Sequence, residues 1–460
     1  MKYLSHISRT LILTAAIFLS ACATTTPYTA YNVERDELQQ WFSSARNVVE
    51  HERGIKLDNV TLSTVSSREM LFVLSDLYGK KLDPNMTADT RIRVFSEKAF
   101  EDVQHVQAVY DPYAKRIVVN QQNMQRYIGL LQHRGVSARN AALTILIHEL
   151  IHAADDKDYD LVAIEQRHKG DTLGVFMVAE GHAELQTETI CAKAGCSAAF
   201  RTAQIEFHGV DPHDTDQSLL TSKNNNGLIY VQGRKFLKAL AARDTDGSLV
   251  RQALNNPPGD VLEFFDPASF PDTSRSSRRK HVYEILESIS LDSAEGPVLK
   301  IPAAVFNESQ LPLNKQERIE YIRDYKRKTL ASGSMSYVEQ YDQDLSSVYV
   351  RLYETASPTA AIEIQQDLIN DQRILAEELK KLGADIRKLN ASELKSISGN
   401  IPAKTVRHVL NYRDRRTNET SQLITSFIIE GRYLIVVGNA DDHTVNDEML
   451  LKVLHKVNAS

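Results

Sequence analysis

The residues best suited to chemistry form the pentapeptide His148-Glu149-Leu150-Ile151-His152. Apolar residues on both sides of it predict a helix, and residues four positions apart lie on one face of a helix. His148 and His152 can therefore present two imidazole nitrogens to one zinc ion, at about 2.0–2.1 Å each. Glu149 lies beside that face and can take a proton from a metal-bound water molecule. This pattern predicts hydrolytic zinc chemistry.

A second predicted helix carries Glu180-Gly181-His182-Ala183-Glu184. Glu180 and Glu184 share one face of it, and the small residues between them allow close approach of another helix. His182 lies on another face of this helix and ranks below Glu180 as a metal ligand. The alternative for the two segments is a buried pair of polar helices without a metal.

Together the two segments resemble the gluzincin metallopeptidases, thermolysin-like and aminopeptidase-like, in which a Glu of a second helix is the third zinc ligand. The resemblance implies a zincin-like fold that binds Zn²⁺ through His148, His152 and Glu180, with Glu149 as general base. It also implies that Glu184 holds the outer N–H of a zinc-bound histidine. The glycine-rich exopeptidase strand of the aminopeptidases is not evident, so aminopeptidase specificity is not implied.

The interval between His152 and Glu180 is longer than in the usual gluzincins. We therefore expect an extra loop over residues 155–170, which can serve as a lid.

A third stretch, Tyr230-Val231-Gln232-Gly233-Arg234-Lys235-Phe236 followed by Asn256-Pro257-Pro258, is similar to a pattern in bacterial HExxH proteins of the zincin type. The similarity implies that Tyr230 donates a hydrogen bond to the tetrahedral oxyanion. The alternative is a tyrosine ring packed in the core. His208 and His213 are alternative donors.

Alternating apolar residues predict a hairpin over His105–Asn120, with Pro112 at its turn. In zincins an antiparallel edge strand precedes the zinc helix and pairs with an extended substrate. We expect residues 117–120 to have this role, followed by a helix whose N-cap is Ser137.

At the start of the chain two basic residues precede an apolar run from Leu11 to Leu19, which is too short to span a bilayer. The run ends in Leu19-Ser20-Ala21-Cys22, which resembles the lipobox of bacterial lipoproteins. This implies a signal peptide over residues 1–21, and a lipidated Cys22 carrying diacylglycerol and a further acyl chain such as palmitate. Ala23 resembles the outer-membrane-sorted class. The alternative is an ordinary secretory signal with an incidental cysteine.

Once Cys22 is lipidated, Cys191 and Cys196 remain in an oxidising compartment. In a continuous helix these two residues face apart, but Gly195 can end the helix and let the chain curl back. The sequence does not decide whether these two cysteines form a disulfide or stay as two reduced thiols.

The 460 residues are 42% hydrophobic and 25% charged, which is typical of a globular protein of two or three domains. A formal net charge of −6 gives no broad footprint for nucleic acid, so we expect no nucleic-acid partner. No later stretch reaches 18 uncharged apolar residues, so the remainder is expected to be soluble and tethered by its acyl chains.

The order of the predicted elements indicates the α+β class. Residues 22–32 form a small polar tether, and residues 33–330 form a mainly helical zincin-like domain. Ala331-Ser332-Gly333-Ser334 is typical of a linker. Residues 335–460 then form a smaller α+β accessory domain. The alternative is that this domain packs tightly on the catalytic one.

These features predict a lipid-anchored zinc metallopeptidase of the bacterial envelope that acts on a peptide or protein. The alternative is a non-catalytic binding or chaperone-like lipoprotein that keeps a structural zinc. Three protein ligands leave the fourth position open for water, which favours the enzyme.

Overall fold

The computed structural model describes residues 31–83, 85–168, 172–208, 227–259, 261–290, 298–303, 315–341, 344–381, 387–388, 405–413, 420–440 and 443–459. The predicted signal peptide, Cys22, His213 and all but the last two residues of the tether lie outside these ranges. The chain divides into two compact units, one ending at Phe270 and the other beginning at Pro271. Both units combine helices with a sheet, so the α+β class is confirmed.

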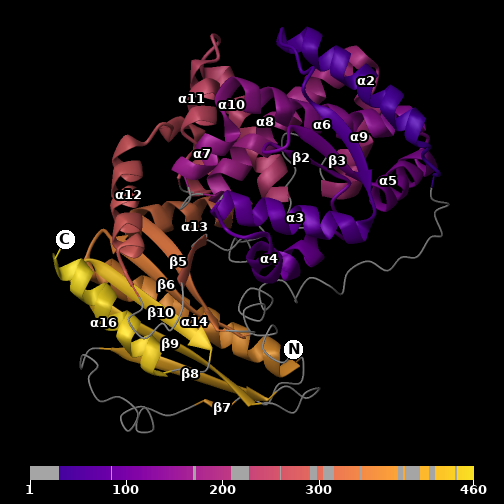
Figure 1. Cartoon of the computed structure of the whole chain (residues 1–460). Helices are drawn as coiled ribbons and strands as arrows, with labels where there is room; N and C mark the ends of the chain where they lie inside the picture. The colour runs from indigo at the N-terminus through magenta and orange to yellow at the C-terminus, as the bar shows by residue number, and fades with distance from the viewer. Residues whose placement is uncertain are drawn as a thin grey trace. The chain divides into compact units, whose positions relative to one another are not determined.

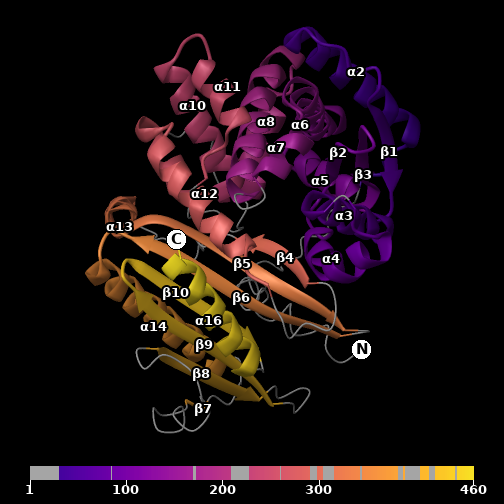
Figure 2. The ribbon, with the colours of Figure 1, turned by 60° about the vertical axis from the view of Figure 1, so that its left-hand side comes forward.

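The N-terminal unit contains a three-stranded sheet in the order β1-β3-β2; β2 and β3 are labelled in Figure 1 and all three strands in Figure 2. β1 (Thr61–Val65) is parallel to β3 (Arg116–Asn120), and β2 (Ala108–Asp111) pairs with β3 as the predicted antiparallel hairpin. Because β3 is paired on both sides, the expectation that residues 117–120 pair with a substrate is wrong. The edge strands of this sheet are β1 and β2, and β2 is the edge strand within the hairpin.

Helices cover both faces of this sheet. The α-helices described in this unit are, in chain order, α2 (Arg35–Arg53), α3 (Ser67–Leu82), α4 (Ala88–Asp102), α5 (Gln121–His133), α6 (Ala138–Tyr159), α7 (Leu161–Arg167), α8 (Thr172–Ala194), α9 (Ser197–Ala203), α10 (Gly233–Arg243) and α11 (Ser248–Asn255). Ile117 and Val119 lie in one core cluster with α2, α5 and α6. Val118 points to the other face, where α3 and α4 pack. This explains why β3 reads as a continuous apolar run.

α6 is the central helix of this unit. Its N-cap is Ser137, as predicted, whose hydroxyl accepts a hydrogen bond from the Asn140 backbone at 3.3 Å. Leu146, Ile147 and Leu150 are fully buried although they point in different directions around the helix. A helix that is apolar on nearly every side must be enclosed by other elements, so the few polar side chains of α6 are held in fixed surroundings.

The C-terminal unit is built on an antiparallel sheet in the order β4-β5-β6-β10-β9-β8-β7. Its elements are α12 (Thr273–Glu287), β4 (Val298–Ala303), α13 (Lys315–Lys328), β5 (Thr329–Tyr341), β6 (Asp344–Thr355), α14 (Pro358–Lys381), β7 (Arg387–Lys388), β8 (Val406–Arg413), β9 (Thr420–Glu430), β10 (Tyr433–Ala440) and α16 (His443–Ala459). α12 and α16 cover one face of the sheet, and α14 covers the other (Figure 2). The predicted hairpin around Gly431, where φ is 56°, is confirmed.

The predicted linker over residues 331–334 is wrong, because these residues lie inside β5. Ala331 and Ser334 are each only 2% exposed. Gly333 lies under α12, and a Cβ atom at that position would stand 2.9 Å from Val282 Cγ1. The small residues therefore permit close packing of a helix on a sheet. The division between the units falls at Phe270 and Pro271 instead, because α12 packs in the core of the C-terminal unit.

Within the described ranges, no helix has the length and apolar character needed to cross a membrane.

Candidate metal centre

Three predicted ligand atoms converge between α6 and α8. Glu180 Oε2 lies 2.9 Å from His148 Nε2 and 3.3 Å from His152 Nε2, and the two Nε2 atoms are 3.2 Å apart. Ligand atoms placed at about 2.0–2.1 Å around a tetrahedral zinc stand about 3.3 Å from one another. The separations therefore fit a zinc ion, and the residue types are those zinc prefers.

Charge compensation holds this cluster together without a metal. Burial alone would lower the pKa of His148, but the hydrogen bond and charge of Glu180 raise it to about 9. Burial disfavours the Glu180 carboxylate, yet the charges and hydrogen bonds of His152 and His148 bring its pKa far below the usual range. Glu180 is therefore an anion that both imidazoles face.

Glu149 is 8% exposed and lies beside the cluster. Burial raises the pKa of its carboxyl group, although the two neighbouring histidines act against this rise. The backbone N–H of Tyr110 in β2 is directed at this carboxyl group and acts to lower its pKa. The raised pKa brings Glu149 closer to neutrality, where a general base works best.

The pairing of β2 with β3 shows which backbone groups of β2 face the site. The backbone of Asn120 donates to the Gln107 carbonyl, so with the observed register Val109 is hydrogen-bonded to β3. Alternate residues of an antiparallel strand point their backbone groups away from the partner. The backbone groups of Ala108 and Tyr110 therefore face the open edge, next to Glu149.

Glu184 occupies the place predicted for it. Its Oε1 is 3.5 Å from His148 Nδ1, the ring nitrogen that faces away from Glu180. Its Oε2 accepts a hydrogen bond of 2.7 Å from Gln204 Nε2. Gln204 begins the π-helical turn η3 (Gln204–His208). No spacing in the sequence identified this residue, because the contact joins residues 20 positions apart through the fold.

His182 is not a ligand of the cluster. Its Nδ1 lies 2.7 Å from Asp155 Oδ2, and Arg53 Nη1 donates to Asp155 Oδ1 at 2.9 Å. Burial would raise the pKa of Asp155, but the charges of His182 and Arg53 lower it below its usual range. This buried network ties α2, α6 and α8 together directly behind the three ligand atoms.

Tyr230 lies near the cluster, in the π-helical turn η5 (Gly227–Gln232). Its ring centroid is 6.1 Å from that of His148 and 5.2 Å from that of His208, with which it stacks. The charge of Glu180, followed by burial, raises the pKa of Tyr230 well above its usual value, so the hydroxyl remains a donor. Burial lowers the pKa of His208 to about 4, so that imidazole is neutral at neutral pH.

The segment expected to form an extra loop over residues 155–170 is mostly helical, so this expectation is wrong. Its first residues extend α6 to Tyr159, and α7 follows at Leu161. Glu165 of α7 pairs with Lys81 at 2.7 Å, and Gln166 Nε2 donates to the Lys81 carbonyl at 2.9 Å. These contacts fix α7 on the end of α3.

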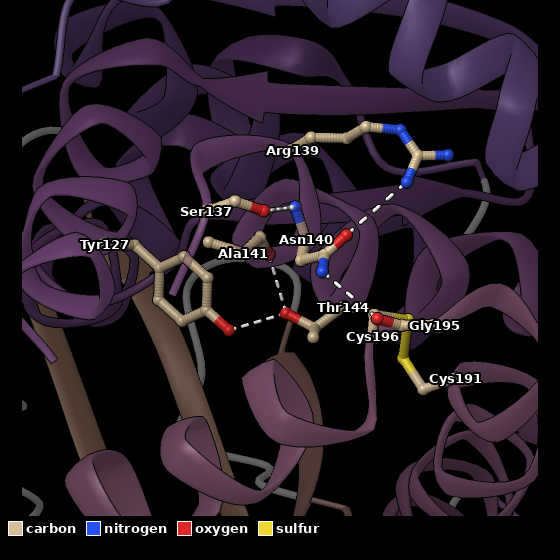
Figure 3. Close-up of a disulfide and its surroundings, with 9 residues drawn as sticks. All are labelled: Tyr127, Ser137, Arg139, Asn140, Ala141, Thr144, Cys191, Gly195 and Cys196. Atoms are coloured by element: carbon tan, nitrogen blue, oxygen red, sulfur yellow. Dashed lines mark hydrogen bonds between the residues drawn. A yellow bond between two sulfur atoms is a disulfide. The ribbon is translucent and has the colours of Figure 1, made fainter. Parts of the chain in front are cut away.

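The disulfide left open by the sequence is formed between Cys191 and Cys196. α8 ends at Ala194, and Gly195 follows it with φ of 76°. The Cys196 N–H donates to the Cys191 carbonyl at 2.9 Å, which is the Schellman closure of a helix end. That closure brings Cys191, the fourth-last residue of α8, next to Cys196, so both thiols meet. Figure 3 shows the bridge beside Asn140 of α6, whose Nδ2 donates to the Gly195 carbonyl at 3.1 Å.

No protein-family model, curated protein or solved structure matches the chain. Function is therefore inferred from the site itself.

Proposed function

We propose that the chain is a zinc-dependent metallopeptidase of the gluzincin type, held in the bacterial cell envelope by a lipid on Cys22. One observation carries the proposal: His148, His152 and Glu180 converge at zinc-ligand separations with the buried carboxylate of Glu149 beside them. A structural zinc site normally has four protein ligands. Three ligands beside a carboxylate base support a catalytic site instead.

The chain supplies the groups that peptide hydrolysis requires. Zinc, when bound, acidifies water and polarises a carbonyl group. Glu149 takes the proton of the attacking water on its carboxylate and passes it to the nitrogen of the leaving amine. Tyr230 donates its hydroxyl proton in a hydrogen bond to the carbonyl oxygen as that oxygen gains negative charge.

The edge of β2 is the part of the fold suited to an extended substrate. Ala108 presents its backbone groups to that edge, and so does Tyr110, whose N–H is directed at Glu149. A peptide strand added there gains main-chain hydrogen bonds whatever its side chains are. The scissile bond would then be held next to the general base.

The envelope location rests on the lipobox and on the buried Cys191–Cys196 disulfide. Structural disulfides form and persist in oxidising compartments such as the bacterial periplasm. Replacement of Cys22 by Ser removes the acceptor thiol, so the precursor is expected to remain unlipidated and uncleaved. Mass spectrometry of the membrane fraction measures both.

The decisive experiment uses the chain lacking residues 1–22 as the parent and compares it with its Glu149→Gln and His152→Ala variants. Elemental analysis should find one zinc in the parent and in Glu149→Gln, and none in His152→Ala. His51→Ala, at an exposed position, is the control that should keep the zinc. A peptide-library digest followed by mass spectrometry should find cleavage in the parent alone. Equal zinc in all four proteins would reject the metal centre. Zinc without cleavage by the parent would indicate a non-catalytic binding protein.

A further inference from the structure

The C-terminal unit holds a cationic side chain that the metal centre does not use. Tyr349, Arg351 and Tyr353 alternate along β6 and so point to the same face of the sheet. Tyr353 packs with Ile364 of α14 in the core cluster on that face. Arg351 therefore lies between two tyrosines on the side of the sheet that α14 covers.

The aromatic neighbours of Arg351 are held in place by the fold. Its guanidinium carbon is 5.3 Å from the ring centroid of Tyr349. A Cβ atom at Gly438 would stand 2.3 Å from Cζ of Tyr349, so only glycine leaves space for that ring over β10. Tyr353 and Tyr325 lie close enough to Arg351 to raise the pKa of its guanidinium group. A ring fixed on the sheet thus presents its face to the cation.

Arg351 differs from comparable cations because no carboxylate neutralises it. Arg53, Arg234 and Arg407 have side chains that are at most 13% exposed, and each pairs with an Asp or a Glu. Within the part of the chain that the structure describes, Arg351 has no ion pair, and its Nε is covered without a hydrogen-bond partner. Burial disfavours the charged form of this guanidinium group, and no carboxylate among the described residues offsets that effect.

Hydroxyl groups stand beside this cation. Ser334 is the register partner of Arg351 in β5 and is 2% exposed. Directly opposed residues on one face lie about 4.5–5.5 Å apart at their Cβ atoms. The next residue on that face of β5, Ser332, shares a hydrogen bond of 3.3 Å with Tyr325. A guanidinium fork among hydroxyls matches a carboxylate or a phosphate group, either of which it can bind through two parallel N–H groups.

We propose that Arg351 anchors an oxyanion-binding site, for a carboxylate or a phosphate group, on the α14 face of the C-terminal sheet. Tyr349 flanks the bound group, and the hydroxyls of Tyr353 and Ser334 complete its hydrogen bonds. The site lies in the unit that begins at Pro271, so it is independent of the proposed peptidase activity.

The test uses the whole chain lacking residues 1–22 and two probes, sodium acetate and inorganic phosphate, each titrated against chloride at equal ionic strength. The change in thermal midpoint is followed for the parent, Arg351→Met and Arg351→Lys. The Met variant is expected to fold, because an apolar side chain replaces an unpaired covered charge. The Lys variant keeps the charge and loses the fork. Arg327→Met is the control, since Arg327 is 65% exposed and pairs with Asp324.

The parent and Arg327→Met should show a saturating response to at least one probe, and the probe that saturates at lower concentration identifies the oxyanion. Arg351→Lys should need at least tenfold more of it, and Arg351→Met should show only the linear rise that salts produce in any protein. If the thermal midpoints of the parent and of both Arg351 variants respond equally to the probe, the proposed site is wrong. A parent that responds no more to acetate and phosphate than to chloride would overturn it as well.

Discussion

Gly181 of α8 and Gly233 of α10 are in direct backbone contact, so close that a Cβ atom on Gly181 would lie 2.3 Å from the Gly233 carbonyl carbon. Each glycine neighbours a residue of the proposed site. Glu180 precedes Gly181 in the chain, and Tyr230 lies three residues before Gly233. The contact between the two glycines therefore sets how near the ligand carboxylate and the tyrosine hydroxyl come to each other.

Gly181→Ala should separate α8 from α10. The added methyl group meets backbone atoms, which cannot turn aside as a side chain can, and overpacking of this kind costs about 1–3 kcal/mol. We expect a lower free energy of unfolding in urea and weaker zinc binding. Ala192→Ser, at an exposed position of the same helix, is the control. Unchanged stability and zinc affinity in Gly181→Ala would contradict the role given to this contact.

Tyr230→Phe removes one hydroxyl and keeps the ring. If this hydroxyl stabilises the developing oxyanion, kcat should fall by about 10²–10³-fold while zinc content stays the same. Tyr433→Phe, in the other unit, should leave kcat unchanged. If Tyr230→Phe keeps the parental kcat, the tyrosine is a packing residue and His208 becomes the candidate donor.

Zinc binding should release protons and strengthen as the pH rises. Burial would lower the pKa of His148, but Glu180 raises it to about 9, so the metal-free imidazole is protonated at neutral pH. A zinc-bound histidine must be neutral, and that proton has to leave. Each proton displaced should change the apparent affinity by about tenfold per pH unit below that pKa. Calorimetry in buffers of different ionisation enthalpy counts the protons, and a count of zero would contradict this pKa.

A chain that ends at Phe270 should fold and keep its zinc, since all the proposed ligands and Tyr230 lie in the N-terminal unit. A chain that ends at Ser334 should behave worse, because it retains α12 and cuts β5 near its middle. The unpaired half-strand and the uncovered apolar face of α12 favour aggregation. Size-exclusion chromatography and elemental analysis of both fragments test this. A soluble, zinc-loaded fragment ending at Ser334 would speak against the boundary at Phe270.

The sequence predicted those parts of the site that depend on local spacing. His148 and His152 are one helical turn apart, and Ser137 is a local cap, so both can be read along the chain. The buried network of Asp155, His182 and Arg53 could not be predicted, because it joins residues up to 102 positions apart. Long-range packing decides such contacts.

The error at residues 331–334 has a related cause. A run of small residues has the same composition whether it forms a flexible linker or lies beneath a helix. Only the presence of α12 over Gly333 distinguishes the two, and α12 belongs to another part of the sequence. Composition alone therefore placed the domain boundary about sixty residues too late.

The placement of Glu149 beside the Tyr110 N–H also bears on self-association. An open strand edge can recruit an edge of another copy and so start aggregation. Because the Tyr110 N–H is directed at Glu149, this side chain shields one of the donors that β2 would offer to a second molecule. Glu149→Gln keeps an acceptor oxygen at this position, whereas Glu149→Ala removes it. The alanine variant is thus expected to be the more aggregation-prone of the two.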